Sequence, residues 1–321
     1  MNKRNRRSIA ALIVLIVALI LAGCGKGSAD GGDAGASGTA ETASAYASSG
    51  GPADGTGASD AAQAQQPRIV STTVAITQIA DALGLPLAGI PTSAKQLPAR
   101  YADVTKIGNP MSPDMEVVKM LKPTAVLSVT TLEYDLKPKF EAAGVQAEFL
   151  DLTSIGHMQQ AIAELGAKYG RESEAASLNA RYDAKIIEAA AFAAGKPSPK
   201  VLILMGVPGS YLVATERSYI GDLVRIAGGV NVAQGEKVEY LASNTEYLHS
   251  ANPDVILRAA HGMPDEVVKM FDQEFKKNDI WKHFDAVKNG RVYDLEESLF
   301  GTTASLGADD ALSRLLELLY P

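Results

Sequence analysis

Two residues in different halves of this chain, a methionine and a histidine, have the types and settings of metal ligands. Met111 lies in the proline-bounded loop Gly108-Asn109-Pro110-Met111-Ser112-Pro113, where Pro fixes the backbone and no core is in evidence. His261 follows the expected strand 255–260, which is apolar except for Arg258, and precedes Gly262, which frees the chain to turn. The alanines before His261 leave room beside its imidazole, so both side chains are candidates for ligation.

Both residues also have an ordinary structural explanation. A loop methionine commonly packs against the base of its own loop, and a single histidine at a strand end is more often structural than ligating. The other three histidines are expected at a helix start, within a helix and near a surface helix, which are structural or solvated settings: His157, His249 and His283. His261 is therefore the strongest ligand candidate of the four.

The pair suits a porphyrin iron better than a structural zinc. Structural zinc takes four nitrogen or sulfur ligands, and this chain has a single cysteine. Histidine and methionine together are a standard axial pair of haem iron. A haem would turn its propionates toward helix N-termini, whose free N–H groups attract anions.

Strands alternate with helices along the chain, which predicts parallel sheets covered by helices on both faces. Expected helices begin at Thr73, where Ser71 to Thr73 offer caps, and at Asp114. A further β-α-β step is expected over residues 136–150. Expected strands cover residues 68–70, 87–90, 125–129, 200–205 and 255–260.

The second half of the chain repeats the first. Glu116 and Glu246 each lie seven residues before a proline that precedes an apolar strand. A cap, a helix and a closing glycine occupy residues 73–84 and again residues 218–228. Two matches in the same order indicate two copies of one β/α arrangement.

The segment 171–194 contains neither proline nor glycine and predicts a helix about 36 Å long, enough to join two lobes. We therefore expect two Rossmann-like α/β lobes, residues 67–170 and 195–321, joined by this single long helix and separated by a cleft. Ligands of such sheets bind outside the carboxyl ends of the strands. Four features of the sequence fall there: residues 73–75, residues 93–94, Met111 and His261.

Residues 1–23 have the pattern of a secretory signal, in which basic residues precede the apolar run 9–22. The only cysteine, Cys24, follows Leu21-Ala22-Gly23 and resembles a bacterial lipobox. That resemblance implies a lipid-modified N-terminus, held at the outer face of the cytoplasmic membrane by the lipid anchor alone. The alternative is a signal-anchor helix, although the run is short for a span of about 20 residues.

Residues 24–66 are almost entirely Gly, Ala, Ser, Thr, Asp and Gln and predict a flexible tether. Removing residues 1–23 removes four of the 30 basic residues and none of the 37 acidic ones, which leaves a formal net charge of −11. A chain this acidic is a poor candidate for binding nucleic acid.

Three long stretches of the sequence carry a family resemblance: residues 108–116, 205–216 and 256–264. In this order they resemble the haem-binding lipoproteins of Isd-type haem-uptake systems, over about residues 68–320. Those lipoproteins are substrate-binding proteins of bacterial ABC importers, with a periplasmic-binding-protein fold of the helical-backbone type. The resemblance implies a receptor without enzymatic activity, which takes haem b (iron protoporphyrin IX) from a surface donor protein and passes it to a permease.

The resemblance also implies site residues. The axial ligands of the family fall on Met111 and His261. Its propionate contacts are largely backbone amides, which fall in this chain on Val74, Ala75, Ser93 and Ala94. The family carries an aromatic residue at the position of Ala94. The acids that dock such receptors onto permease arginines fall on Glu116 and Glu246, for which solvated charge near a helix start is the alternative.

Two other functions fit parts of the sequence. An iron–siderophore or cobalamin receptor on the same scaffold would use converging Arg and Tyr side chains, and Arg258 or Tyr211 could serve. An α/β hydrolase could use Ser210, Asp254 and His261, which follow the order Ser…Asp…His. The stretch before Ser210 is not a G-x-S-x-G nucleophile elbow, however, which argues against a hydrolase.

Overall fold

The computed structural model describes residues 67–243, 248 and 250–321, which belong to one compact unit. The predicted signal, the lipidation site Cys24, the tether and Glu246 lie outside the described residues, as does His249. Within the described part of the chain, no helix is both long and apolar enough to cross a membrane.

The N-terminal lobe is a five-stranded parallel sheet in the order β3-β2-β1-β6-β7. Alternate residues of its central strand face opposite ways, since Ile69 packs in a cluster with α1 and α4 and Val70 in a cluster with α2 and α3. Helices thus cover both faces, as predicted. The strands are β1 (Ile69–Ser71), β2 (Leu87–Ile90), β3 (Thr105–Lys106), β6 (Ala125–Val129) and β7 (Ala147–Leu150), and the helices are α1 (Val74–Ala82), α2 (Met115–Met120) and α3 (Glu133–Ala142).

The C-terminal lobe has a mixed sheet in the order β11-β9-β8-β12-β13, with β10 also paired to β8. β8 runs parallel to β10 and β12, and β12 parallel to β13, but β9 turns back on β8 at Gly209 (φ +83°) and β11 pairs antiparallel to β9. The internal repeat did not predict these two antiparallel strands. The strands are β8 (Lys200–Val207), β9 (Ser210–Ala214), β10 (Val230–Asn231), β11 (Tyr240–Ala242), β12 (Val255–Ala260) and β13 (Val292–Asp294).

Helices cover both faces of this second sheet too. Helices α6 (Tyr219–Ile226) and α10 (Ala308–Leu319) bury their apolar sides with Val201 and Ile203 of β8. Helices α8 (Pro264–Lys277) and α9 (Asp285–Lys288), with the 3₁₀ turn Asp279–His283, pack against Leu202 and Leu204 on the other face. The fully buried Trp281 stacks on Phe275 at 4.3 Å between ring centroids and anchors this second layer.

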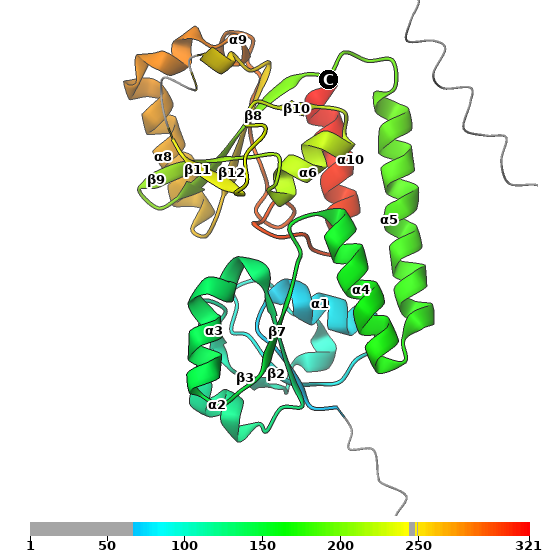
Figure 1. The fold of residues 1–321 in the computed structure, drawn as a ribbon. Coiled ribbons are helices and arrows are strands. Elements are labelled where there is room, and N and C mark those ends of the chain that lie inside the picture. The colour runs from blue at the N-terminus through cyan, green and yellow to red at the C-terminus, as the bar shows by residue number, and fades with distance from the viewer. Residues whose placement is uncertain (1–66, 244–247, 249) are drawn as a thin grey trace, which may run out of the picture. The chain divides into compact units, whose positions relative to one another are not determined.

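Two helices that lie side by side connect the lobes, α4 (Ile155–Tyr169) and α5 (Glu172–Ala193) (Figure 1). Gly170 turns the chain between them with φ +64°. At 1.5 Å per residue α5 is about 33 Å long, and it contacts α4 at one end and α10 of the second lobe at the other. The expected long connecting helix is confirmed. The domain bounds 67–170, 171–194 and 195–321 stay a prediction, because α4 itself begins against the second lobe.

The internal repeat is visible in the backbone. The side chains of Thr73 and Ser218 cap α1 and α6, each accepting a hydrogen bond from the N–H three residues on. Lys122 (φ +45°) and Asn252 (φ +33°) each precede the proline of their copy in the left-handed region. Corresponding positions of the two lobes therefore share an unusual backbone conformation even though their residue types differ.

Candidate functional site

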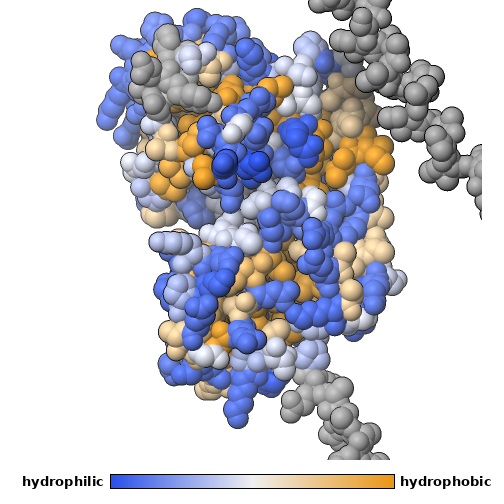
Figure 2. Space-filling model, viewed as in Figure 1, coloured by the Kyte–Doolittle hydropathy of each residue, from blue (hydrophilic) through white to orange (hydrophobic). Residues whose placement is uncertain are grey.

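The edges formed by the carboxyl ends of the strands in the two sheets face each other across the boundary between the lobes. Lys95 follows β2 and Glu297 follows β13, and the ammonium of the first lies 3.3 Å from the carboxylate of the second. A backbone hydrogen bond from Ala304 to the carbonyl of Leu152 joins the lobes a second time. Figure 2 shows a notch between the lobes at the left of the view. Ligands of open α/β sheets bind at such strand ends. The boundary between the two lobes, called the seam below, is therefore the expected ligand site.

Met111 lies at the tip of a small hairpin formed by β4 (Gly108–Asn109) and β5 (Ser112–Pro113). Its N–H donates to the Asn109 side-chain oxygen at 2.9 Å, which fixes the turn. The side chain is 57% exposed. The hairpin therefore does not bury Met111, which counts against the packing explanation, and its thioether is free to meet a ligand.

The base of this hairpin is held firmly. Gly108 has φ +96°, and its carbonyl accepts a hydrogen bond from Thr92 N–H at 2.8 Å, which ties the hairpin to the loop after β2. Asp114 caps α2 by accepting from Glu116 N–H and Val117 N–H, as its position in the sequence predicts. The hairpin and the start of α2 thus form one rigid connection.

His261 stands where β12 ends. Its N–H donates to the Gly206 carbonyl at 2.8 Å, which continues the β8–β12 pairing by one residue. Gly262 (φ +71°) then turns the chain into α8. The residue is exposed, and its imidazole has no hydrogen-bond partner among the described residues. Both ring nitrogens are therefore available for ligation.

The four predicted amide contacts lie on the same edge as Met111. Val74 and Ala75 open α1, and as residues of the first turn their N–H groups have no partner within the helix. Ser93 and Ala94 lie in the loop after β2, where the Ser93 hydroxyl accepts from Lys95 N–H at 2.9 Å. Within the described chain the N–H groups of these four residues have no hydrogen-bond partner. They form a set of free donors suited to an anion.

The two predicted ligands lie on facing edges of different lobes. The Met111 hairpin is tied to the loop after β2, which carries Lys95. Its partner Glu297 follows β13, and β13 lies beside β12, the strand that ends at His261. The structure thus brings both features to the seam.

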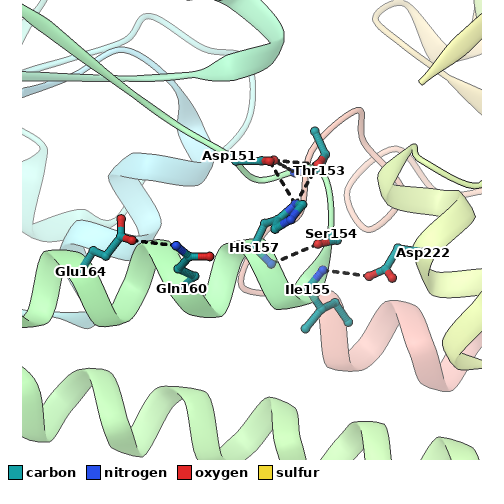
Figure 3. A network of polar contacts seen from close by, with 8 residues as sticks. All are labelled: Asp151, Thr153, Ser154, Ile155, His157, Gln160, Glu164 and Asp222. Carbon is teal, nitrogen blue, oxygen red and sulfur yellow. Dashed lines mark hydrogen bonds and ion pairs between the residues drawn. The ribbon is translucent and has the colours of Figure 1, made fainter. Parts of the chain in front are cut away.

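A cavity of about 750 Å³ lies elsewhere along the seam, and the sequence did not predict it. Its polar network includes Asp151 Oδ2, which lies 3.0 Å from His157 Nδ1, and Thr153, which donates to Asp151 (Figure 3). None of the predicted haem contacts lines it. The lining residues are Thr130, Asp151, Thr153, Ser154, His157, Glu216, Arg217, Asp222, Arg225, Lys237, Val238 and Glu239.

Acidic groups from both lobes meet in this cavity. Burial raises the pKa of the Glu239 carboxyl, and the nearby Asp151 carboxylate raises it further. One oxygen of Glu239 is buried without a hydrogen-bond partner in the described part of the chain. His157 lies in the first turn of α4, near the helix start as predicted, and its N–H donates to the Ser154 hydroxyl. In the sequence, the signal for this cavity was the capping serine Ser154 after β7, followed three residues later by His157.

Arg258 is not available for an anionic iron complex. It is 9% exposed, and its guanidinium donates to Asp294 at 2.7 Å and to Asp272 at 3.1 Å. It also lies over the rings of Phe271 and Phe275. Tyr211, the other candidate for a siderophore site, donates its hydroxyl to Glu274 at 3.3 Å. Both side chains are occupied in holding α8 to the sheet and to the aromatic cluster.

The proposed hydrolase triad is wrong. Asp254 precedes β12 and His261 follows it, so the whole strand, about 20 Å, separates them. The Asp254 carboxylate instead accepts a hydrogen bond from Lys200 N–H at 2.7 Å. No relay from acid to imidazole is possible over that distance.

Comparisons with known proteins agree with this architecture. A family model described as "Periplasmic binding protein" matches residues 69–299. The high-affinity heme uptake system protein IsdE of Staphylococcus aureus is 54% identical over 256 residues, which cover 79% of this chain and 87% of that protein. An ABC transporter substrate-binding protein from Listeria monocytogenes EGD-e superposes with a TM-score of 0.77 at 64% identity, covering 80% of this chain and 99% of that one. S. aureus IsdE in complex with haem gives 0.77 at 53% identity, with 79% and 99% covered.

Proposed function

Since this chain belongs to the periplasmic binding protein family, we propose that it is the haem receptor of an ABC importer. The observation that supports the proposal is that Met111 and His261, both exposed, each follow a strand at the carboxyl edge of a different sheet. Relatives named for haem uptake and solved with haem support the same ligand for this chain. Both predicted ligand types suit haem iron.

In this proposal His261 and Met111 are the axial ligands of haem b, which is cargo and leaves unchanged. His261 offers the lone pair of a neutral imidazole from a short, rigid turn. Met111 offers a thioether from a hairpin whose base is fixed by hydrogen bonds. Because each ligand comes from a different lobe, iron binding links the two lobes without any chemical change in the substrate.

The propionates would meet the free N–H groups of Val74, Ala75, Ser93 and Ala94. A helix N-terminus and a turn with unpaired amides both favour negative charge. Ala94 carries no aromatic ring to cover the porphyrin edge, so its contribution is limited to the backbone.

Delivery would use exposed acidic residues of the two lobes. Glu116 lies in the first turn of α2 with its side chain 86% exposed, in reach of an arginine on a membrane permease. Glu246 is its counterpart in the repeat. Cys24 would anchor the receptor to the outer face of the cytoplasmic membrane, where a surface protein donates haem. We expect no enzymatic activity from this chain.

Absorption spectroscopy tests the proposal directly. Hemin is titrated into the purified mature protein, and ferric siderophore and cobalamin are titrated in parallel. We expect a saturable Soret band and the visible spectrum of low-spin, six-coordinate iron, with no binding of the other two ligands. Binding of a siderophore or cobalamin without a hemin response would contradict the haem assignment.

A further inference from the structure

One ion pair crosses between the lobes beside the predicted propionate contacts. The Lys95 ammonium lies 3.3 Å from Glu297 Oε1 and 3.4 Å from the Glu297 carbonyl oxygen. The two residues follow strands of different sheets and are 202 positions apart in the sequence. The contact therefore closes the seam at the edge where Ser93 and Ala94 lie.

Lys95 is well placed to meet a carboxylate. Its N–H closes the turn on the Ser93 hydroxyl, so its side chain leaves from the turn that exposes the N–H groups of Ser93 and Ala94. In residues 91–98, the whole loop after β2, Lys95 is the only charged residue. The four predicted amide contacts offer partial charges alone, whereas the two propionates of haem carry full negative charges.

The ion pair between Lys95 and Glu297 is weak enough for another carboxylate to replace Glu297. The Lys95 side chain is 45% exposed and that of Glu297 is 23% exposed, so water screens their attraction. Pairs of this kind are weak, and one carboxylate replaces another at little net cost. Glu297 presents the same chemical group as a propionate, so it competes with the cargo for a single cation.

We propose that Lys95 is a propionate-positioning residue whose ammonium is held by Glu297 in the empty protein and passes to a haem carboxylate on loading. This inference rests on the proposed function. Loading would break the tie between the lobes at this edge, and unloading would restore it. Glu297 would thereby lower haem affinity and hasten release, which suits a receptor that must surrender its cargo.

A double-mutant cycle tests the exchange. Hemin affinity and dissociation rate are measured for the wild type, Lys95→Gln, Glu297→Gln and the double variant. We expect Glu297→Gln to tighten binding about 2- to 5-fold, the range of exposed ion pairs. Lys95→Gln should weaken it by roughly 3- to 10-fold, as for a charge-assisted hydrogen bond in partial contact with water. In the Lys95→Gln background, Glu297→Gln should have no effect.

Two controls sharpen the cycle. Hemin dimethyl ester has no carboxylate to receive Lys95, so the four proteins should bind it with one affinity. Lys139→Gln removes the same charge from an exposed position on α3 and should leave hemin binding unchanged. Thermal unfolding of each variant checks the fold, which surface substitutions of this kind should preserve.

The outcomes separate this inference from the function on which it rests. A wild type that does not bind hemin overturns both. Hemin binding with the low-spin spectrum, but with equal affinity in all four proteins, overturns the exchange alone. An equal gain from Glu297→Gln with and without Lys95 would mean that Glu297 repels haem directly, and would also overturn it.

Discussion

The N–H of Asp114 donates to the carbonyl oxygen of Ile107 at 2.7 Å, across the base of the hairpin that carries Met111. The same aspartate caps α2 through its side chain. One residue thus closes the hairpin and begins the helix. The backbone that carries the Met111 thioether is held by these hydrogen bonds. The hairpin therefore loses less conformational entropy when Met111 binds iron.

Met111→Ala should convert the haem complex from six-coordinate low-spin iron to a five-coordinate or water-bound species, because His261 would remain the sole protein ligand. The absorption spectrum of the hemin complex measures this. Met120→Ala is the matched control, since Met120 is 68% exposed on α2 and outside the site. An unaltered spectrum in Met111→Ala would show that Met111 does not bind the iron.

His261→Ala should weaken hemin binding by at least about tenfold, because the iron loses a direct ligand. Removing a residue that only hydrogen-bonds to a metal ligand already lowers metal affinity by about tenfold. Titration of hemin followed at the Soret band gives the affinity. His157→Ala is the informative comparison, because His157 lines the 750 Å³ cavity from the other lobe. If His157→Ala changed the haem spectrum and His261→Ala did not, haem would bind in that cavity instead.

The contribution of Glu239 to the stability of the protein should fall as pH rises through the titration of this carboxyl. Burial and Asp151 raise the pKa of this carboxyl above its usual value of 4.5, so the folded state favours its protonated form. The stability linked to that proton is present below about pH 4.5 and is lost as pH rises through the higher folded pKa. Glu239→Gln should therefore melt at a higher temperature than the wild type at pH 7.5.

At pH 4 the same two proteins should melt together, because the wild-type carboxyl is then protonated. Glu141→Gln, an exposed substitution on α3, serves as the control and should show no gain at either pH. A gain for Glu239→Gln of equal size at both pH values would assign the effect to something other than ionisation.

Arg258→Ala should destabilise the fold by about 2–4 kcal/mol, because it removes a nearly buried side chain that packs on two aromatic rings and pairs with two carboxylates. Asp272→Ala should cost less than about 1 kcal/mol, since Asp272 is 51% exposed and water replaces its contact. Urea unfolding followed by the fluorescence of Trp281, which lies in the same layer, measures both. Equal losses for the two variants would contradict a central role for Arg258.

Local patterns in the sequence predicted the local structure well. The caps Thr73, Ser218 and Asp114 follow from hydrogen bonds that span only two or three residues, so a short stretch contains all the information. The exposure of Met111 did not follow from the turn alone, since packing against the base of its own loop is the ordinary explanation for a loop methionine. His261 was placed at a strand end because the apolar run before it is unambiguous.

Contacts between distant segments could not be predicted in this way. The pair of Lys95 and Glu297 depends on how two sheets meet, which no local pattern records. Strand β9 runs antiparallel to β8 because the chain reverses in a tight turn at Gly209, and β11 then pairs antiparallel to β9. The match between the two halves of the sequence did not predict this turn. The cavity lined by Asp151 and Glu239 has the same origin, since its walls come from two lobes.

The start of α4 has a consequence for how the chain reaches its native state. The N–H of Ile155 is satisfied by Asp222 at 3.0 Å, and the Tyr182 hydroxyl in mid-α5 by the carbonyl of Leu306 at 3.2 Å. The N-terminal lobe and the connecting helix therefore complete these two hydrogen bonds only with residues of the second lobe. The described protein should accordingly unfold in one cooperative transition rather than lobe by lobe.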